Sequence, residues 1–496
     1  MTTQDLARPV RLPRRSRQGV VMGMDGWQLA CLTAAALIVL ISVNRFGPPG
    51  LLYGAPLYLP LGAFAFVTVH GYSAPRQLGL WAMKQARHAM GATQHRYRPE
   101  RTHLAGTLNL PGIRASIQLW DIDGVACVYN PHDRSASVTA EVEVQGFLMK
   151  DVPERYDLAQ QWSPALASFT QRPGIKRAVL QERTLPTTIR AARDHYGSVA
   201  SHRELDTDSP LARNYDEVLN RSERFAVSHR NYLTFTLDLI ALSPQLKALG
   251  GGEDAVKSLA SLEARNLADA LGAARITVRR WLNARDVAAL TRVGFDPEFA
   301  ANVQNRDEDH SGVDPVAIGP MYLEEPRGKN GIVFTDSGVH TTMWIHEWPR
   351  SDAAVGFVEP IVFARMPGTG EAITHILSIV LTPVSVKKAM RRIEDDKKVW
   401  RGNERLRAKR GVDGSAADAA DWDALERQEE EIVAGHGEFR YGAYLTVTAP
   451  DEERLDQAIA GMRNALARAG MEPQILYCQQ AEALMVNVLP LGLGMK

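Results

Sequence analysis

Two long apolar stretches stand near the start of the chain, and in each the hydrophobic residues follow one another without alternation. Trp27 to Val43 and Leu51 to Val69 contain no charged residue. Each is close to the roughly 20 residues that a helix needs to cross a bilayer. Pro56 and Pro60 interrupt the second stretch, but proline kinks are tolerated in spanning helices. The pattern predicts a transmembrane helical hairpin over residues 27–72, whose spans end at Trp27, Val43, Leu51 and Val69.

Two other interpretations of this region are open. An apolar hairpin can be buried in a soluble core, and the arginines that precede it resemble the basic start of a signal peptide. After Val43, however, the chain continues with Asn44-Arg45-Phe46, which is not the small-residue site at which a signal peptide is cleaved. A second apolar run follows at once, so the spanning hairpin is the preferred interpretation.

The basic residues around the spans predict their orientation. The connecting turn contains only Arg45, whereas both flanks are rich in arginine and lysine, and such flanks stay in the cytoplasm. The basic residues of the flanks are Arg8, Arg11, Arg14, Arg15 and Arg17 before the hairpin, and Arg76, Lys84, Arg87, Arg96, Arg98 and Arg101 after it. We expect a multi-pass inner-membrane protein with a basic cytoplasmic tail (1–26), a juxtamembrane linker near anionic lipid (73–103) and a cytoplasmic body.

The body shows short alternating runs from Leu104 onward, which predict strands, and longer amphipathic stretches, which predict helices. A first set of elements consists of strand Val138 to Phe147, helix Glu154 to Thr170, strand Ile175 to Thr184, a helix near Leu211 to Arg224, strand Asn231 to Ala241, helix Asp254 to Gly272, strand Arg275 to Trp281 and helix Ala284 to Val293. Its order is βαβ, helical insert, βαβ.

A second set repeats this order. It consists of strand His340 to Trp348, helix Ala353 to Ala364, strand Thr374 to Leu381, the helical stretch Ser385 to Val433, strand Phe439 to Ala449, helix Glu452 to Ala469, strand Gln474 to Cys478 and a short helix Ala481 to Met485. The third strands share a motif, Tyr232 to Thr236 (YLTFT) and Tyr444 to Thr448 (YLTVT). Tyr, Thr and Val populate strands in general, so the motif alone proves nothing.

The repeated order favours a duplication, and it predicts the fold class. We expect an α+β protein in which two ferredoxin-like split-βαβ units with helical insertions follow the transmembrane hairpin. The units would cover residues 104–310 and 311–496, because the acidic, turn-rich segment Asn305 to Pro315 separates the two sets.

The long helical stretch over residues 385–433 is a candidate docking arm. Its first half is basic and its second half acidic, so the two halves of a helical hairpin would pair with each other. The alternative is an arm that projects and binds a partner or phosphate. The candidate docking residues are Lys387, Lys388, Arg391, Arg392, Lys397 and Lys398.

Charge and cysteine content exclude several classes of protein. Lysine plus arginine and aspartate plus glutamate number 57 each, which argues against a protein that coats nucleic acid along its length. Cys31, Cys127 and Cys478 stand singly, so neither a disulfide framework nor a paired-cysteine metal or redox site is expected.

Each catalytic or metal-binding signature fails at a named residue. Gly250 to Gly252 precede Lys257-Ser258, but Val256 stands where a phosphate loop needs glycine, and Gly368-Thr369-Gly370 lacks the last glycine of a dinucleotide loop. His346-Glu347 starts like a zincin motif, yet Pro349-Arg350 replaces the second ligand and breaks the helix. His340 and His346 are six residues apart, so on a strand they would lie about 20 Å apart, which is too far for both to bind one metal ion. We expect no enzyme, and no catalytic, cofactor-binding or metal-binding residues.

The body resembles the non-motor N-terminal half of the large inner-membrane ATPases of conjugation and type IV secretion. The resemblance lies in Leu262 to Trp281, in Tyr441 to Ala449 with the following Asp451 to Leu455, and in Leu489 to Gly492 (LPLG), which in those ATPases leads into the P-loop motor. The hairpin resembles the small two-span subunit that partners the ATPase. A fusion of the two is similar to conjugal-transfer-like membrane proteins of actinobacteria. Walker motifs are missing from the sequence, so the resemblance does not imply nucleotide hydrolysis.

The resemblance implies a scaffold that anchors a separately encoded P-loop ATPase to a translocation channel. The expected partners are the lipid bilayer, this ATPase and other channel subunits, with nucleic acid only as cargo, and the assembled protein is expected to be oligomeric. An alternative is a membrane-tethered protein that guides DNA. A third class, an enzyme with an unrecognised site, would need a polar cluster that the sequence does not reveal.

Overall fold

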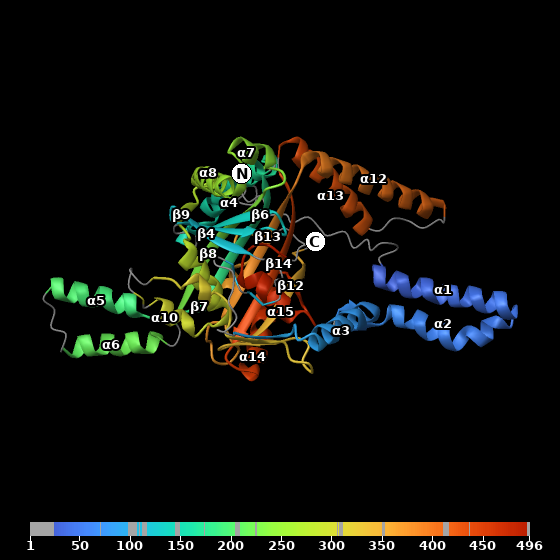
Figure 1. Cartoon of the computed structure of the whole chain (residues 1–496), viewed down its shortest axis with the longest axis horizontal. Coiled ribbons are helices and arrows are strands. Elements are labelled where there is room, and N and C mark those ends of the chain that lie inside the picture. The colour runs from blue at the N-terminus through green and yellow to red at the C-terminus, as the bar shows by residue number, and fades with distance from the viewer. Residues whose placement is uncertain are drawn as a thin grey trace.

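The computed structural model combines helices and strands in one mixed architecture (Figure 1). It describes residues 24–69, 71–97, 107–108, 110–111, 117–143, 149–172, 174–203, 209–223, 226–304, 306, 311–349, 353–409, 416–435 and 437–493. Most of the expected basic tail lies outside these residues, and so do the expected unit boundary at residue 310 and the basic residues Arg98 and Arg101.

The front of the chain forms two antiparallel apolar helices, α1 (Gly26–Phe46) and α2 (Gly50–Phe66). Asp25 caps α1, because its carboxylate accepts the backbone N–H of Gln28. Among the described residues, α1 is the one helix that is both long and apolar enough to cross a membrane, and α2 is a shorter apolar helix.

The second apolar helix ends earlier than the expected span end at Val69. It stops at Phe66, because Val67 adopts an extended conformation. Thr68–Val69 then forms a short strand, β1, which pairs with β2 (Tyr72–Ser73). The turn between them contains Gly71 at φ +80°, a conformation that favours glycine.

The expected juxtamembrane linker is divided between a helix and the sheet of the body. Residues Ala74–Ala89 form α3. Gln94–Arg96 then forms β3, which pairs with β10 (Tyr322–Glu324). This end of the segment therefore belongs to the body.

The first set of elements has the expected order and follows a strand hairpin, as the alternating runs predicted. It also contains a second helix in its insert and two short helices of six residues each that were not expected. Its elements are β4 (Gln118–Ile122), β5 (Val125–Asn130), β6 (Ser135–Glu143), α4 (Val152–Gln171), β7 (Ile175–Pro186), α5 (Arg190–His202), α6 (Pro210–Glu223), β8 (Val227–Asp238), α7 (Ser243–Ala248), α8 (Gly252–Ala273), β9 (Thr277–Trp281), α9 (Ala284–Phe295) and α10 (Phe299–Gln304).

The second set follows the same plan after a short 3₁₀ turn at Pro315–Ala317. Its elements are β10, β11 (Val333–Thr335), β12 (Val339–Glu347), α11 (Glu359–Val362), β13 (His375–Val384), α12 (Val386–Lys409), α13 (Ala416–Val433), β14 (Glu438–Ala449), α14 (Glu452–Arg468), β15 (Glu472–Ile475) and α15 (Gln480–Val488). The expected helix over residues 353–364 is reduced to α11, because Gly356 adopts φ +91° just before it.

The strands described in the body join one sheet of 13 strands, in the order β3-β10-β11-β12-β14-β13-β7-β8-β6-β5-β4, with β15 on β12 and β9 on β6. The first set contributes the order β9-β6-β8-β7 and the second β15-β12-β14-β13, with every neighbouring pair antiparallel. The equivalent strands β7 and β13 pair antiparallel with each other. We call this junction the seam, and it relates the two sets by an approximate half-turn.

Helices cover both faces of the sheet and form three large apolar cores. On one face, α8 buries Leu259, Leu267 and Leu271 over the first set, and α14 covers the second set with its own core. On the opposite face, α9 and α15 share a core with side chains of both sets, including Tyr232 and Ile376. The two sets are therefore joined by their strands and by a common core.

Candidate functional site

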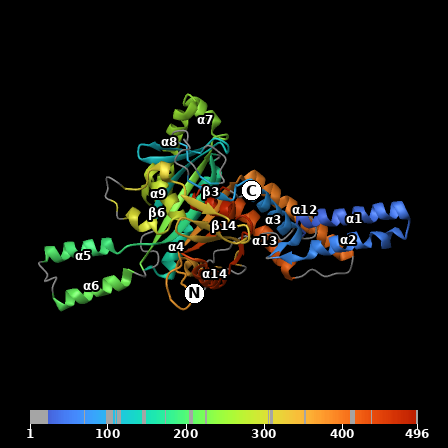
Figure 2. The same ribbon diagram turned by 60° about the horizontal axis from the view of Figure 1, so that its bottom comes forward.

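Two helical arms leave the body at equivalent places. The first arm, α5 with α6, connects β7 to β8, and the second, α12 with α13, connects β13 to β14. We call α12 and α13 the basic arm. Figures 1 and 2 show the first arm on one side of the body, and the basic arm on the other side together with α1 and α2. The residues expected for docking thus lie on the side of the body that carries the apolar helix.

The basic arm has a small core of its own at its base and an aromatic pair farther out. Ala389, Ile393 and Ile432 are buried against each other. The rings of Trp400 and Trp422 lie 4.6 Å apart between their centroids. These contacts hold α12 and α13 together as one projecting hairpin.

Three of the six candidate docking residues are engaged within the arm and its base. Lys397 pairs with Glu429 across the hairpin and lies over the Trp422 ring, 5.5 Å from its centroid. Lys398 pairs with Asp395 at 3.2 Å. The guanidinium of Arg392 lies 3.8 Å from both Asp396 and Glu438. The pairing of basic and acidic halves is therefore realised at one described position, Lys397 with Glu429.

The other three candidates lie together at the base of α12. Lys387, Lys388 and Arg391 are exposed, and none has an ion-pair partner among the described residues. Lys387 and Arg391 are four residues apart, so they project from the same side of the helix. The base of the arm therefore presents three cations that are free to bind an anionic group.

A buried cation crosses the seam on the face covered by α9 and α15. Arg183 of β7 is fully buried and donates to the side-chain oxygen of Gln181 at 2.6 Å. Its other nitrogens donate to the carbonyl oxygens of Leu290 in α9 and Val488 at the end of α15. Burial lowers the pKa of Arg183 to about 10, so the group stays charged at neutral pH. Arg183 thus ties both covering helices to the seam.

Neighbouring amides extend this network across the seam. Gln181 donates to Ser378 of β13 and to the backbone oxygen of Asn487, each at 2.7 Å. Asn487 in turn donates to the backbone of Ile376 at 2.9 Å and to the hydroxyl of Thr446 at 2.8 Å. Strands of both sets are therefore held by one polar network under α15.

A second buried cluster lies at the seam on the opposite face of the sheet. Glu182 of β7 lies between His229 of β8 at 3.3 Å and His375 of β13 at 3.2 Å, and Thr184 donates to it at 2.8 Å. Burial raises the pKa of Glu182, but the two imidazoles and the Thr184 hydroxyl outweigh this effect and lower the pKa to about 2. The carboxylate therefore remains ionised in the folded protein.

This cluster predicts an acid-sensitive contribution to stability. The Glu182 carboxyl has an ordinary pKa of 4.5 and a folded-state pKa of about 2, so its contribution is complete above pH 4.5 and is lost as the pH falls toward 2. In Glu182→Gln we expect this contribution, about 3 kcal/mol, to disappear. Urea unfolding between pH 7 and pH 3 measures it. If the free energy of unfolding of Glu182→Gln falls with decreasing pH as steeply as that of the unaltered protein, the assignment is wrong.

A third buried charge fixes α3 to the body. The amino group of Lys84 is completely enclosed and lies 3.6 Å from the Glu325 carboxylate, which is also fully buried. It donates to the backbone oxygens of Pro326 and Lys329 at 2.8 and 2.7 Å and to the Asn330 side chain at 3.0 Å. The helix that follows the apolar pair is therefore bound firmly to the second set.

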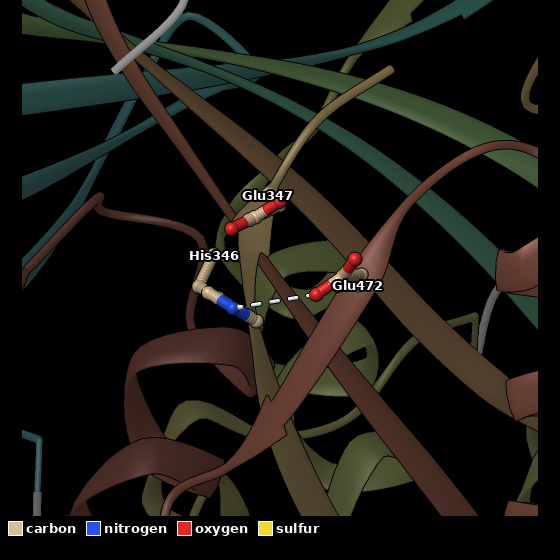
Figure 3. Close-up of side chains that lie close together, drawn as sticks. All are labelled: His346, Glu347 and Glu472. Atoms are coloured by element: carbon tan, nitrogen blue, oxygen red, sulfur yellow. Dashed lines mark ion pairs between the residues drawn. The ribbon is translucent and has the colours of Figure 1, made fainter. Parts of the chain in front are cut away.

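Within the described ranges, one group of side chains has the composition of a metal site. Potential ligand atoms of His346, Glu347 and Glu472 lie within 4.8 Å of one another at the edge where β12 pairs with β15 (Figure 3). The dashed line in Figure 3 joins His346 Nε2 to Glu472 Oε2 over 3.8 Å, a contact that becomes an ion pair when His346 is protonated. His346 and Glu347 lie on a strand, so they lack the helical spacing of a zincin motif.

The histidine that shares this strand has a different environment. His340 is fully buried and hydrogen-bonds Thr335 at 2.6 Å and Thr448 at 2.8 Å. Burial lowers the pKa of His340 to about 3, so the ring is neutral at physiological pH. The strand β12 thus carries a buried structural histidine, His340, and a partly exposed histidine, His346.

The sequence did not single out Arg183, Glu182 or Lys84. A local signal was present in β7, where Gln181 to Thr184 (QERT) is a polar run that follows the apolar segment Ala178 to Leu180. Such a run is typical of an exposed strand end. Only the covering helices and the neighbouring strand β13 turn it into a buried network.

Comparison with known proteins assigns no family to this chain. No family model and no curated protein matches it.

Proposed function

We propose that the protein is a non-catalytic inner-membrane scaffold of a conjugation- or type IV secretion-like machine, and that it docks a separately encoded P-loop ATPase. The observation that carries this proposal is the basic arm. Lys387, Lys388 and Arg391 are exposed at its base and have no ion-pair partner in the part of the chain that the structure describes. The arm leaves the body on the side that carries α1. The resemblance of the sequence to the non-motor half of such ATPases supplies the identity of the partner, and by the same resemblance the assembled protein contacts other channel subunits and forms an oligomer.

We further propose that α1 and α2 cross the membrane as a hairpin, with the body and both termini in the cytoplasm. The 17 residues of α2 span about 26 Å, near the lower limit for a crossing. Ser73 donates to the Asp25 carboxylate at 2.6 Å, and Gln28 donates to the Ala65 backbone at 2.9 Å. These bonds hold the start of α1 beside the end of α2, which is the arrangement that a two-span hairpin requires.

The same proposal treats each set of the body as a ferredoxin-like unit. Within the first set the strands are ordered fourth, first, third and second, all antiparallel, and the second set repeats that order. This is the order that two interlocked split βαβ units produce. Insertion of an arm between the second and third strands of each unit supports a duplication followed by divergence of the arms.

Charge reversal at the base of the basic arm tests the docking proposal. In a variant with Lys387→Glu, Lys388→Glu and Arg391→Glu, we expect recovery of the ATPase with the tagged protein to fall about tenfold or more, because three attractive contacts become repulsive. Recovery is measured by quantitative mass spectrometry after gentle solubilisation. Arg392 and Lys397 stay unchanged, since they hold the arm together.

The first arm offers a matched control with the same change of net charge. Arg203, Arg213 and Arg221 are exposed there, and their reversal to Glu should leave recovery unchanged. Equal recovery from both variants would remove the basic arm from the proposal. The same three cations also suit phosphate, so recovery of only nucleic acid, lost steeply with added salt, would favour the DNA-guiding alternative.

A further inference from the structure

The helix α3 buries its polar face and exposes its apolar face, which is the reverse of an ordinary surface helix. Its polar face points into the body, where Lys84 is fully buried and Arg87 donates to the backbone of Cys478 and pairs with Glu482. His88 on the same face hydrogen-bonds Thr93 at 2.9 Å. Surface helices normally bury their apolar stripe and expose their charges.

Beyond the first turn, where Arg76 is exposed, the outward face of α3 and its C-cap is apolar. Leu78, Met83 and Met90 are 53%, 59% and 66% exposed. Between them lie three further exposed residues at helical spacing, Ala82, Ala86 and Ala89. We call these six residues the outer face of α3. A continuous exposed apolar strip of this kind marks an interaction surface.

The outer face begins where the apolar helices join the body. Only the β1–β2 turn separates α2 from α3. The side-chain hydroxyl of Ser73, next to the start of α3, binds the cap of α1, and the Trp27 ring packs within 3.2 Å of the position that a Gly79 side chain would occupy. Figure 1 shows α3 between α1 and α2 on one side and the body on the other.

We propose that the outer face of α3 contacts lipid at the boundary between headgroups and acyl chains of the cytoplasmic leaflet. This inference rests on the proposed membrane hairpin, with which the outer face is continuous. Lipid is the occupant that this continuity favours, because a helix beginning at a bilayer surface meets lipid first. Trp81, half-exposed at the edge of the outer face, is of the residue type that is enriched at this boundary.

The proposed contact gives the body a second attachment to the membrane. Lys84 and Glu325 fix the polar face of α3 to the second set, while the outer face would enter the interface to a depth of about 5–10 Å. The basic arm leaves the same side of the body. The orientation of α3 in the interface would therefore set the position at which the arm meets a partner.

Single-cysteine labelling in vesicles tests this proposal on the full chain. Cys127 and Cys478 are fully buried, so replacing the partly exposed Cys31 by alanine leaves a background with no accessible thiol among the described residues. Met83→Cys and Met90→Cys then carry a polarity-sensitive fluorophore on the outer face. The protein is reconstituted into phosphatidylethanolamine–phosphatidylglycerol vesicles, with or without lipid spin-labelled near the headgroup end of its acyl chain.

We expect blue-shifted emission at both positions and strong quenching by the shallow spin label. Glu453→Cys, exposed on α14, is the control that should stay in water and unquenched. Leu40→Cys, exposed on α1, reports separately on the hairpin and should be quenched best by lipid labelled near the chain end.

The outcomes separate the two proposals. Labels at Met83 and Met90 that behave like the label at Glu453 would overturn the lipid contact, even where Leu40 is quenched and the hairpin stands. Labels that are blue-shifted but not quenched would also overturn it, because protein rather than lipid then covers the outer face. Quenching at Met83 and Met90 without quenching at Leu40 would overturn the membrane hairpin and support the lipid contact of α3.

Discussion

Replacing Arg183 by methionine is expected to lower the free energy of unfolding by about 3–5 kcal/mol. The substitution keeps most of the side-chain volume but leaves the oxygens of Gln181, Leu290 and Val488 without their donor in a site closed to water. The measurement is urea unfolding of the purified protein, followed by circular dichroism at neutral pH. Because Arg183 ties α15 to the seam, hydrogen exchange should also increase in α15 and β13.

Two further variants make this prediction specific. Arg183→Lys keeps the charge but offers a single amino group, which cannot reach three acceptors in different directions, so its loss should be intermediate. Arg391→Met removes an exposed arginine of the basic arm and should change stability by no more than about 0.5 kcal/mol. A loss below about 1 kcal/mol in Arg183→Met would show that the seam does not depend on this cation.

Replacing Lys84 by methionine is expected to release α3 from the body. The variant leaves the Glu325 carboxylate buried without its cation, and breaking such a pair costs about 3–5 kcal/mol. If this cost lowers the free energy of local opening of α3, backbone hydrogen exchange over residues 74–89 should become faster by on the order of a hundredfold or more. Hydrogen exchange read by mass spectrometry measures it, and α14 serves as an internal reference that should not change.

A double variant separates the ion pair from simple packing. Lys84→Met combined with Glu325→Gln removes the uncompensated charge, so exchange in α3 should return part of the way toward that of the unaltered protein. A double variant that exchanges as fast as Lys84→Met would show that the buried charge of Glu325 is not the cause. Unchanged exchange in Lys84→Met would remove this lysine as the anchor of α3.

The sequence predicted most helices and strands, because their signals are local. Asp451 stands directly before α14 and caps it, and apolar residues recur at helical spacing along α8. The helix α5 was missed, since its sequence is mostly polar and small, and the contact of Tyr196 with Tyr215 of α6 cannot be predicted from a local pattern. The helix expected over residues 353–364 is mostly absent. Its apolar residues have helical spacing, but Gly356 adopts a positive φ that a helix cannot contain.

For the candidate site, the sequence identified a charged helical stretch but not its division of roles. Lys387, Lys388 and Arg391 differ from Arg392 and Lys397 only in what surrounds them, and that depends on Glu438 and Glu429 from distant segments. The buried clusters at Arg183, Glu182 and Lys84 could not be predicted from the sequence for the same reason. A buried charge needs partners, and most of the partners of these three lie far away in the sequence.

The sequence by itself determined the apolar front of the chain, the repeated order of strands and helices, and the position of the basic arm, because these depend on hydrophobic period, caps and turn residues. Only the tertiary structure decided that β7 pairs with β13, that α9 and α15 share one core, and that α3 turns Lys84 and Arg87 inward and its apolar face outward. Strand edges and helix faces choose their neighbours by the total surface buried, and that sum includes residues hundreds of positions away.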